Sequence, residues 1–387
     1  MGRAAGAWTV AVVFLVGMIG TTLPTPLYPI YERHFGFGGL VVTLVFAAYA
    51  VGVLAALLLV GDLSDRVGRR PVLGAGVAFA VVSGAVFLID AVPALFAGRV
   101  LSGISAGIFT GTATATIVDL APARRASRSG LLAAAVNMLG LGLGPVTAGV
   151  LAQFAPWPLR LPYAVHLVLM LLLGAALLAV PEPVRRPAGR VRLRVQRLAV
   201  PAEVRGTFVP AAIAGFAGFA VLGLFTSVSP LFLTGVLGIE DHAVTGAVVF
   251  VLLGSSTIGQ VASESLDRHR CLVGGCAVLA AGVLVVAAGI GTRSLWAFLL
   301  GAVVAGLGQG MSFRSGLTSV TSGAPADQRS GVSSAFFVVL YVALSLPVIG
   351  VGAAAQAFGI VPAGVVFAGI VAVLAVGAGL VLARRTS

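Results

Sequence analysis

The sequence predicts an all-α polytopic membrane protein of twelve transmembrane helices, arranged as two pseudo-symmetric six-helix bundles. Composition, the spacing of apolar runs and an internal repeat lead to this fold class. Of the 387 residues, 59% are hydrophobic and 9% are charged, whereas an average soluble domain carries about 25% charged residues. Twelve spans of about 20 residues use roughly 240 residues, which leaves room for short loops. This composition excludes a soluble enzyme, a disordered chain and a disulfide scaffold.

Apolar runs separated by Arg, Pro and Gly predict where the twelve helices lie. They cover residues 8–30, 39–60, 71–89, 93–118, 130–154, 161–180, 207–234, 244–262, 271–290, 295–318, 330–350 and 360–383. The first run contains no A-x-A cleavage site, so we interpret it as an uncleaved helix rather than a signal peptide. Pro24, Pro26 and Pro29 break the outer half of this helix, which makes it a candidate gate.

The basic residues report topology. The chain has 24 basic residues, all of them arginine, and a net charge of +12; nineteen arginines lie before the first span, after the last span or in every second loop. This distribution is the positive-inside pattern. It predicts that both termini are cytoplasmic, in agreement with the even number of spans. Because topology accounts for the charge, we expect no nucleic-acid partner.

Two motif pairs indicate an internal duplication. The sequence GDLSDR at residues 61–66 has a counterpart in SESLDR at residues 263–268, and the motif that begins APA at residue 121 recurs at residue 324. The pairs have nearly equal spacing, 57 residues from Asp65 to Pro122 and 58 from Asp267 to Pro325. Parallel repeats of six helices are typical of secondary transporters.

The duplication also predicts the domain organisation. A stretch rich in arginine and proline lies near the midpoint of the chain. We expect an N-terminal bundle over residues 1–183, a basic cytoplasmic linker over residues 184–206 and a C-terminal bundle over residues 207–387.

The loop between the second and third spans carries the most specific motif. It reads GDLSDRVGRR from Gly61 to Arg70 and resembles the signature loop G-x-L-x-D-R-x-G-R-R/K of the major facilitator superfamily. Gly68 permits a tight turn that a Cβ obstructs, and Asp65 suits the positive end of a neighbouring helix. The alternative, a generic positively charged loop, does not demand this spacing of Gly, Asp and Arg.

The resemblance implies a conformational latch on the cytoplasmic side. In the superfamily, Asp65 is expected to meet the start of the eleventh helix and, by the repeat, Asp267 the start of the fifth. Asp119, at the end of the fourth span, is expected to pair with Arg69 or Arg66; a solvated aspartate is the alternative. The expected latch residues are Gly61, Asp62, Asp65, Arg66, Gly68, Arg69, Arg70, Asp119, Asp267 and Arg268.

The fourth and fifth spans carry two further patterns. Arg99, Gly103 and Gly107 resemble the superfamily's R-x-x-x-G-x-x-x-G stretch, in which the arginine is associated with proton coupling or substrate binding and the glycines admit a neighbouring helix. The alternative is that Arg99 snorkels to the outer interface. The fifth span resembles the motif of proton-linked exporters, and a plain helix-packing role is the alternative. Its residues are Gly140, Gly144, Pro145 and Gly149, with Ala148 where the motif has glycine.

The substrate path is less well defined by sequence. By the resemblance, cavity candidates are Tyr28, Asn137, Phe225 and Gln309. Charged groups within or beside the spans are functional candidates by default. Arg314 is therefore expected either to bind an anion or to pair internally, and Glu32 either to take up protons or to lie solvated in a loop.

Other chemistry is not expected. The chain has no lysine and therefore no phosphate-binding P-loop. Cys271 and Cys276 lack the company of a metal site, and His166 stands alone in the sixth span, where packing or a helix–helix hydrogen bond is expected. We predict that the protein is no enzyme and needs no cofactor or metal.

The sequence is thus identified as that of a secondary active transporter in the bacterial plasma (inner) membrane. The leading interpretation is a monomeric antiporter that exports small hydrophobic or amphipathic molecules, drugs or metabolites, by alternating access. Its partners are then a small-molecule substrate, protons and the lipid bilayer. Because membrane-depth acids are few, we expect a proton gradient rather than sodium as the energy source. The alternative is a proton-coupled importer of a small organic metabolite, followed by a membrane sensor that transports nothing.

Overall fold

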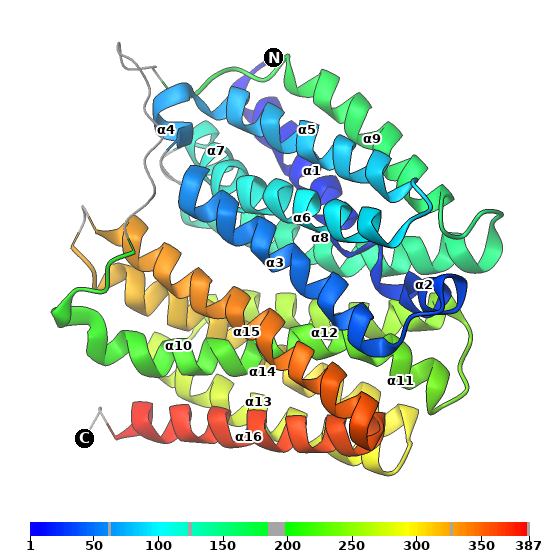
Figure 1. The fold of residues 1–387 in the computed structure, drawn as a ribbon. Coiled ribbons are helices and arrows are strands. Elements are labelled where there is room, and N and C mark those ends of the chain that lie inside the picture. The colour runs from blue at the N-terminus through cyan, green and yellow to red at the C-terminus, as the bar shows by residue number, and fades with distance from the viewer. Residues whose placement is uncertain (61–62, 123–125, 185–197, 326–327, 385–387) are drawn as a thin grey trace. The chain divides into compact units, whose positions relative to one another are not determined.

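The computed structural model describes residues 1–60, 63–122, 126–184, 198–325 and 328–384, without the side chains of Ala126 and Ser127. Within these ranges every regular element is a helix (Figure 1). Gly61 and Asp62 of the signature loop, and residues 185–197 of the expected linker, lie outside the described residues.

Each predicted span matches a helical segment, with ends that differ by at most eight residues. The first six spans are α1 (Arg3–Thr22) with α2 (Tyr28–Phe35), α3 (Gly39–Val60), α5 (Arg69–Phe87), α6 (Val92–Ile108) with α7 (Thr114–Leu120), α8 (Ala126–Phe154) and α9 (Leu161–Leu177), and the short α4 (Leu63–Val67) precedes α5. The last six are α10 (Ala202–Gly223) with α11 (Ser229–Gly235), α12 (His242–Ala262), α13 (Arg268–Gly291), α14 (Leu295–Ser322), α15 (Arg329–Phe358) and α16 (Ile360–Ala383). Among the described residues, eleven segments are long and apolar enough to cross a bilayer, and α9 is a shorter apolar helix.

The first span of each half is interrupted. A 3₁₀ turn at Thr25–Leu27 separates α1 from α2, as the three prolines predict. In the seventh span a π-helical turn at Leu224–Val228 separates α10 from α11. The offset of 202 residues between Asp65 and Asp267 carries the first break onto residues 227–229, which overlap the second break. The fourth span also contains a π-helical turn, at Phe109–Ala113, which the sequence analysis did not predict.

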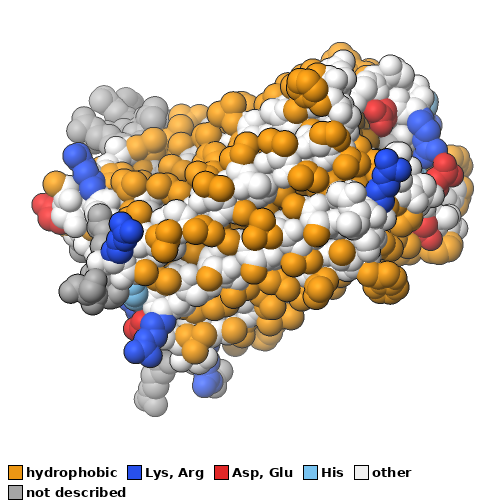
Figure 2. Space-filling model, turned by 90° about the horizontal axis from the view of Figure 1, so that it is seen from below, with side chains coloured by type: hydrophobic (Ala, Val, Ile, Leu, Met, Phe, Trp, Pro, Cys, Tyr) orange, Lys and Arg blue, Asp and Glu red, His pale blue; other side chains and the backbone are white. Residues whose placement is uncertain are grey.

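Hydrophobic side chains cover the outside of the spans. Figure 2 shows one face of the molecule, on which they fill the middle while arginine and acidic side chains gather toward the two ends. Val373 and Leu172 are 72% and 64% exposed. Such a continuous apolar surface suits the hydrocarbon interior of a bilayer.

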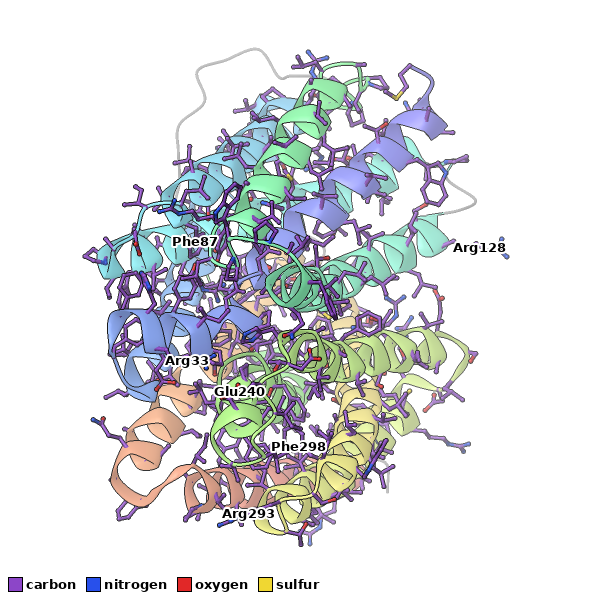
Figure 3. All side chains as sticks on the ribbon, turned by 90° about the vertical axis from the view of Figure 1, so that its right-hand side faces the viewer. Arg33, Phe87, Arg128, Glu240, Arg293 and Phe298 are labelled. Carbon is purple, nitrogen blue, oxygen red and sulfur yellow. The ribbon has the colours of Figure 1, made fainter. Side chains whose placement is uncertain are left out.

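The chain forms two compact units. The first comprises Met1–Leu27 and Ala48–Arg197, and the second comprises Tyr28–Ala47 and Leu198–Ser387. Contacts within the second unit explain why α2 and the start of α3 belong to it: Thr43 of α3 packs against Gly352 of α15. Arg33 of α2 also lies 4.0 Å from Glu240 (Figure 3), although a pair this exposed contributes little stability. The expected bundle boundaries, which keep the whole of the first two spans in the N-terminal half, stay a prediction.

The first unit is built on close helix approach. α1 packs on α8 and α9, and α5 packs on α6 and α9. Where α6 crosses α3, a Cβ on Gly103 would collide with the Tyr49 carbonyl oxygen, and one on Gly107 would lie 2.6 Å from the Ala56 Cβ. The expected role of these two glycines in admitting a neighbouring helix is confirmed.

The second unit has an aromatic and glycine-rich interior. α14 packs on α13, α12 and α10, and α16 packs on α13. The Phe225 ring stacks on Phe298, with ring centroids 4.7 Å apart, and Phe225 has no exposed surface. Phe225 therefore contributes to packing inside this unit.

The α3–α6 crossing predicts a measurable difference between two glycine substitutions in the first unit. Gly103→Ala should lower stability by about 1–3 kcal/mol, because overpacked groups force the backbone to move. Gly74→Ala should raise stability by about 0.5–1 kcal/mol, because its Cβ would meet nothing within 4 Å. Thermal unfolding of the purified variants measures both effects. Equal melting temperatures for the two variants would contradict the crossing.

Candidate functional site

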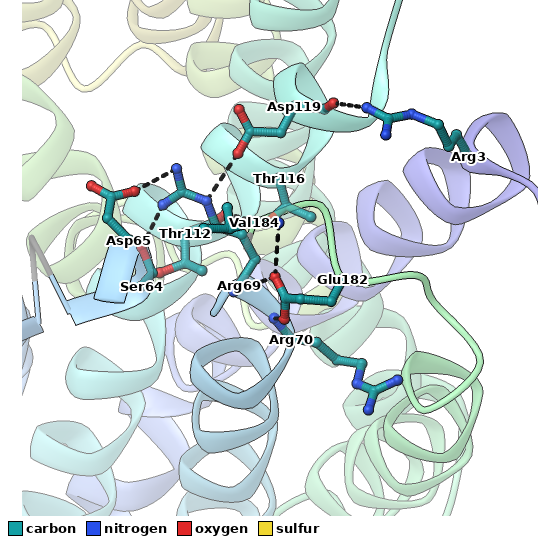
Figure 4. Close-up of polar contacts among 10 residues, drawn as sticks. All are labelled: Arg3, Ser64, Asp65, Arg69, Arg70, Thr112, Thr116, Asp119, Glu182 and Val184. Atoms are coloured by element: carbon teal, nitrogen blue, oxygen red, sulfur yellow. Dashed lines mark hydrogen bonds and ion pairs between the residues drawn. The ribbon is translucent and has the colours of Figure 1, made fainter. Parts of the chain in front are cut away.

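Arg69, at the start of α5, is the centre of the main polar cluster in the first unit (Figure 4). Its Nη2 lies 2.7 Å from Asp65 Oδ1, its Nε donates to Asp119 Oδ2 at 3.0 Å, and its Nη1 donates to Ser64 Oγ at 2.5 Å. The Arg69 side chain is 12% exposed. One planar guanidinium thus joins α4, α5 and α7, which is a geometry that arginine suits and lysine does not.

A carboxylate caps the first backbone N–H groups of α5. Gly68 precedes the helix with φ of +107°, a conformation that a Cβ strains, as the signature motif predicts. Glu182, which follows the sixth span, accepts the backbone N–H groups of Arg69 and Arg70 at 2.8 and 2.9 Å. A carboxylate at this position satisfies orphan N–H groups and the positive end of the helix dipole.

The expected pairing of Asp119 is therefore confirmed with Arg69 as the partner. Asp119 is additionally fixed through its backbone, because Arg3 Nη2 donates to its carbonyl oxygen at 2.6 Å. Arg66 lies nearby in α4. The expected contact of Asp65 with the eleventh span, and the latch role of the whole group, stay predictions.

The corresponding corner of the second unit is assembled differently. Asp267 caps α13, and its Oδ1 accepts from Arg270 N at 2.9 Å. Arg314 pairs with Glu264, with Nη2 and Oε1 3.5 Å apart. Of the two options for Arg314, the structure thus contains the internal pair. Arg268 reaches Ser322 Oγ at 3.5 Å.

Arg99 lies inside the first unit and is 2% exposed, so the alternative of snorkelling to the outer interface is wrong. Its Nη1 donates to the Thr21 carbonyl oxygen, and its guanidinium lies 4.7 Å from the centre of the Tyr49 ring. Thr21 is in the last turn of α1, where carbonyl groups lack helical partners and the dipole favours a cation. Arg99 thereby stabilises the point at which the first span breaks.

The fifth-span motif packs α8 on α1. A Cβ on Gly140 would lie 2.6 Å from the Met18 Cβ, and one on Gly144 would collide with Thr22. Pro145 has no N–H, so the Leu141 carbonyl four residues earlier loses its helical partner. Thr22 Oγ1 of α1 donates to that carbonyl at 2.8 Å. The motif therefore joins two helices through close packing and one specific hydrogen bond, and Gly149 is buried further along α8.

His166 makes the expected helix–helix hydrogen bond. Its Nε2 lies 3.0 Å from the Val16 carbonyl oxygen of α1, and because a carbonyl only accepts, this nitrogen carries the hydrogen. Gly20 leaves room for the ring, since a Cβ there would collide with it.

The remaining candidates lie in both units. In the second unit, Tyr28 and Gln309 are buried, and Gln309 Oε1 accepts from Ser256 Oγ at 2.5 Å. Glu32 is half-buried on α2. Asn137 is half-buried on α8 of the first unit, and its Oδ1 has no hydrogen-bond partner among the described residues. Their roles along a substrate path stay predictions.

Sequence reasoning missed Glu182. The signal was available: it is the sole acidic residue between Asp119 and Glu203 and sits amid many arginines. Its partners, the N–H groups of Arg69 and Arg70, are more than 110 residues away in sequence, and no local pattern connects the two segments.

The family model that describes the Major Facilitator Superfamily matches residues 10–348. The chain belongs to this superfamily. Its fold is also similar to that of a bacterial homologue of the human lysosomal transporter Spinster, solved in an inward-facing, unoccupied conformation. That match has a TM-score of 0.77 at 15% identity and covers 99% of this chain and 98% of the other.

Curated relatives match over part of the chain. The quinolone resistance protein NorA of Staphylococcus aureus is 29% identical over 153 residues, which are 39% of this chain and 38% of NorA. The MFS-type transporter pydD of an Acremonium species is 33% identical over 144 residues, which are 37% of this chain and 25% of pydD. The chain thus aligns with less than half the length of these relatives.

The Major Facilitator Superfamily is a family of multi-pass membrane transporters, and its members are generally not enzymes. Within the described residues no group of three or more His, Cys, Asp or Glu side chains is placed to hold a metal ion.

The Arg69–Asp119 pair predicts a charge-swap result. Arg69→Asp and Asp119→Arg should each impair transport and stability, and the double variant should recover part of both losses, because it restores one ion pair. The recovery should be partial, since Asp65 and Ser64 also contact Arg69. The expected coupling energy in thermal unfolding is about 0.5–3 kcal/mol. A double variant no better than the worse single one would leave the pairing without energetic support.

The Thr22–Leu141 hydrogen bond predicts that the effect of one residue depends on another. Thr22→Val should cost about 1–3 kcal/mol in the wild-type background, because the Leu141 carbonyl is left unpaired. In a Pro145→Ala background the backbone N–H at residue 145 supplies a partner, and the same change should cost less. Thermal unfolding of the four variants tests this, and equal costs in both backgrounds would overturn it.

Proposed function

We propose that the protein is a proton-coupled exporter of small hydrophobic or amphipathic molecules that works by alternating access. The observation that carries this proposal is the fifth-span motif, from Gly140 to Pro145, packed on α1 and hydrogen-bonded through Thr22. The same stretch resembles the motif of proton-linked exporters. The similarity to NorA supports export as well, since a membrane transporter confers resistance to a drug by removing it from the cell.

The geometry of the first unit suits this mechanism. α1 is held at its broken end from two sides, by Arg99 of α6 at Thr21 and by the Leu141 carbonyl of α8 at Thr22. Helices joined in this way move together, as alternating access by rigid-body rocking requires. The Arg69 cluster extends the connection to α4, α5 and α7.

Protons are the proposed energy source. The acidic groups in or beside the described spans are few, and Asp119 and Glu264 each face an arginine. Protonation of either carboxylate removes one charge of its ion pair and weakens its contact with the arginine, so binding of a proton changes which conformation is favoured. Glu32 on α2 is the third candidate for protonation. No cofactor is required in this scheme.

We further propose a bacterial plasma-membrane location with both termini in the cytoplasm, in accord with the positive-inside pattern. The arginine-rich ends then place the Asp65 and Asp267 groups on the cytoplasmic side as the two halves of a latch. The transporting unit is a monomer, and its partners are the substrate, protons and the surrounding lipid.

Transport in inverted membrane vesicles tests the direction and the coupling. Energised inverted vesicles should accumulate a fluorescent quinolone and lipophilic dyes, both cationic and neutral, and a protonophore should abolish the accumulation. Vesicles without the protein are the control. No accumulation here, with metabolite uptake in right-side-out vesicles, would replace the exporter proposal by the importer. Accumulation that survives the protonophore would overturn proton coupling.

The latch predicts a transport defect without a folding defect. Asp65→Asn should reduce transport to near the background of protein-free vesicles, because the amide keeps the shape of the side chain and loses its charge. Because Asp65 is 60% exposed, the variant should insert normally and give the same amount of folded protein. Glu203→Asn is a control, an acidic residue in the first turn of α10 outside the signature loop. Wild-type transport by Asp65→Asn would remove the latch from the mechanism.

A further inference from the structure

A groove runs between α5 and α9 on the outside of the first unit. It has a volume of about 630 Å³, within the range of about 300–1,000 Å³ typical of ligand pockets. Apart from Arg70, every residue that lines it is apolar or glycine. Val82, Leu171 and Leu178 on its walls are 49%, 53% and 72% exposed, so the groove opens sideways, where lipid surrounds a membrane-spanning helix.

The groove follows the line along which α5 and α9 run side by side, toward the end of α9. With 17 residues, α9 is about 26 Å long at 1.5 Å per residue, which is less than the hydrocarbon thickness of about 30 Å. Its helix ends at Leu177, and Leu178, just beyond it, contacts Arg70 at the start of α5. The groove is deep at Gly74, which has no side chain and where a Cβ would meet nothing within 4 Å. Apolar side chains of both helices thus line an open groove.

Arg70 closes the end of the groove at which α9 stops. Its Nη1 donates to the carbonyl oxygens of Leu178 and Val180, at 3.1 and 3.4 Å. These contacts hold the guanidinium in place and use one of its three nitrogens. Within the described part of the chain, Nε and Nη2 form no hydrogen bond or ion pair, and together they carry three N–H donors.

Glu182 contacts the backbone of Arg70 rather than its guanidinium. The Glu182 carboxylate accepts the backbone N–H groups of Arg69 and Arg70, so it caps the start of α5, and among the described residues it forms no ion pair with the Arg70 guanidinium. An apolar groove that ends in a fixed guanidinium matches a molecule with a hydrocarbon chain and an anionic head. Phosphate oxygens are favoured partners of arginine.

We propose that this groove binds an anionic phospholipid, with an acyl chain along α5 and α9 and the phosphate at Arg70. The acyl chain then covers the apolar walls of the groove. The lipid phosphate also pairs with Arg70, which is next to Arg69 at the start of α5. This inference concerns lipid binding and does not depend on the direction or energy source of transport.

Lipid retention by the purified full-length protein tests the proposal. The protein in detergent is mixed with equal amounts of phosphatidylglycerol and phosphatidylcholine of identical chains, and retained lipid is counted by native mass spectrometry. Wild type should retain one phosphatidylglycerol in preference to phosphatidylcholine. Gly74→Leu should lose that lipid, because its side chain occupies the groove. Gly369→Leu is the matched control, a glycine of α16 that also has nothing within 4 Å, and it should retain the lipid.

A second variant tests the contribution of Arg70 to lipid selectivity separately from the groove. Arg70→Gln should lower the preference for phosphatidylglycerol about fivefold, the effect expected of one arginine near an anionic headgroup. Equal retention of the two lipids by wild type, or an unchanged preference in Arg70→Gln, overturns the anionic selectivity. Unchanged retention in Gly74→Leu overturns the groove as the site. The Gly74→Leu result decides the location even if Arg70→Gln proves unstable.

Discussion

The structure depends on one constraint: a backbone carbonyl that loses its helical partner inside an apolar span must find another donor. Water is absent from the bilayer interior, so each unpaired group costs several kcal/mol. Where Pro145 removes a donor, Thr22 supplies one to Leu141. Where the first span breaks, Arg99 donates to Thr21. At the end of α9, where the last carbonyl groups of a helix lack partners, Arg70 donates to Leu178 and Val180. In each case the replacement donor comes from a different helix, so repairing a break also joins two helices.

The two halves use their charges differently despite their common repeat. In the first unit, Arg69 gathers Ser64, Asp65 and Asp119 around one guanidinium, and Glu182 caps the helix that carries it. In the second, Asp267 caps α13, and Arg314 pairs with Glu264 instead. The planar Arg69 guanidinium contacts three partners at once, which restricts the geometry of the cluster in the first unit. The second unit uses a separate helix cap and a separate ion pair instead.

Glycine and arginine together explain how α1 is integrated into the first unit. Gly140 and Gly144 bring α8 against it, Gly20 admits the His166 ring from α9, and Arg99 reaches its broken end from α6. α1 is thereby tied to three helices at successive levels. Anchored in this way, α1 moves together with the rest of the first unit. Its continuation α2 belongs by its contacts to the second unit. The break at Thr25–Leu27 is therefore the point at which the first span passes from one unit to the other.

The sequence by itself determined the fold class, the twelve spans, the break in the first span and the pairing of Asp119 with Arg69 or Arg66, because hydropathy, proline and a specific motif act locally or through a known spacing. The structure selected Arg69 of these two. Tertiary structure decided what no local pattern contains. Glu182 meets the start of α5 from more than 110 residues away, and Arg99 turns inward because the end of α1 offers it a carbonyl and Tyr49 a ring. Phe225, a cavity candidate by sequence, stacks on Phe298 inside the second unit. Partners distant in the chain are chosen by the geometry of helix packing, and the residues alone do not specify that geometry.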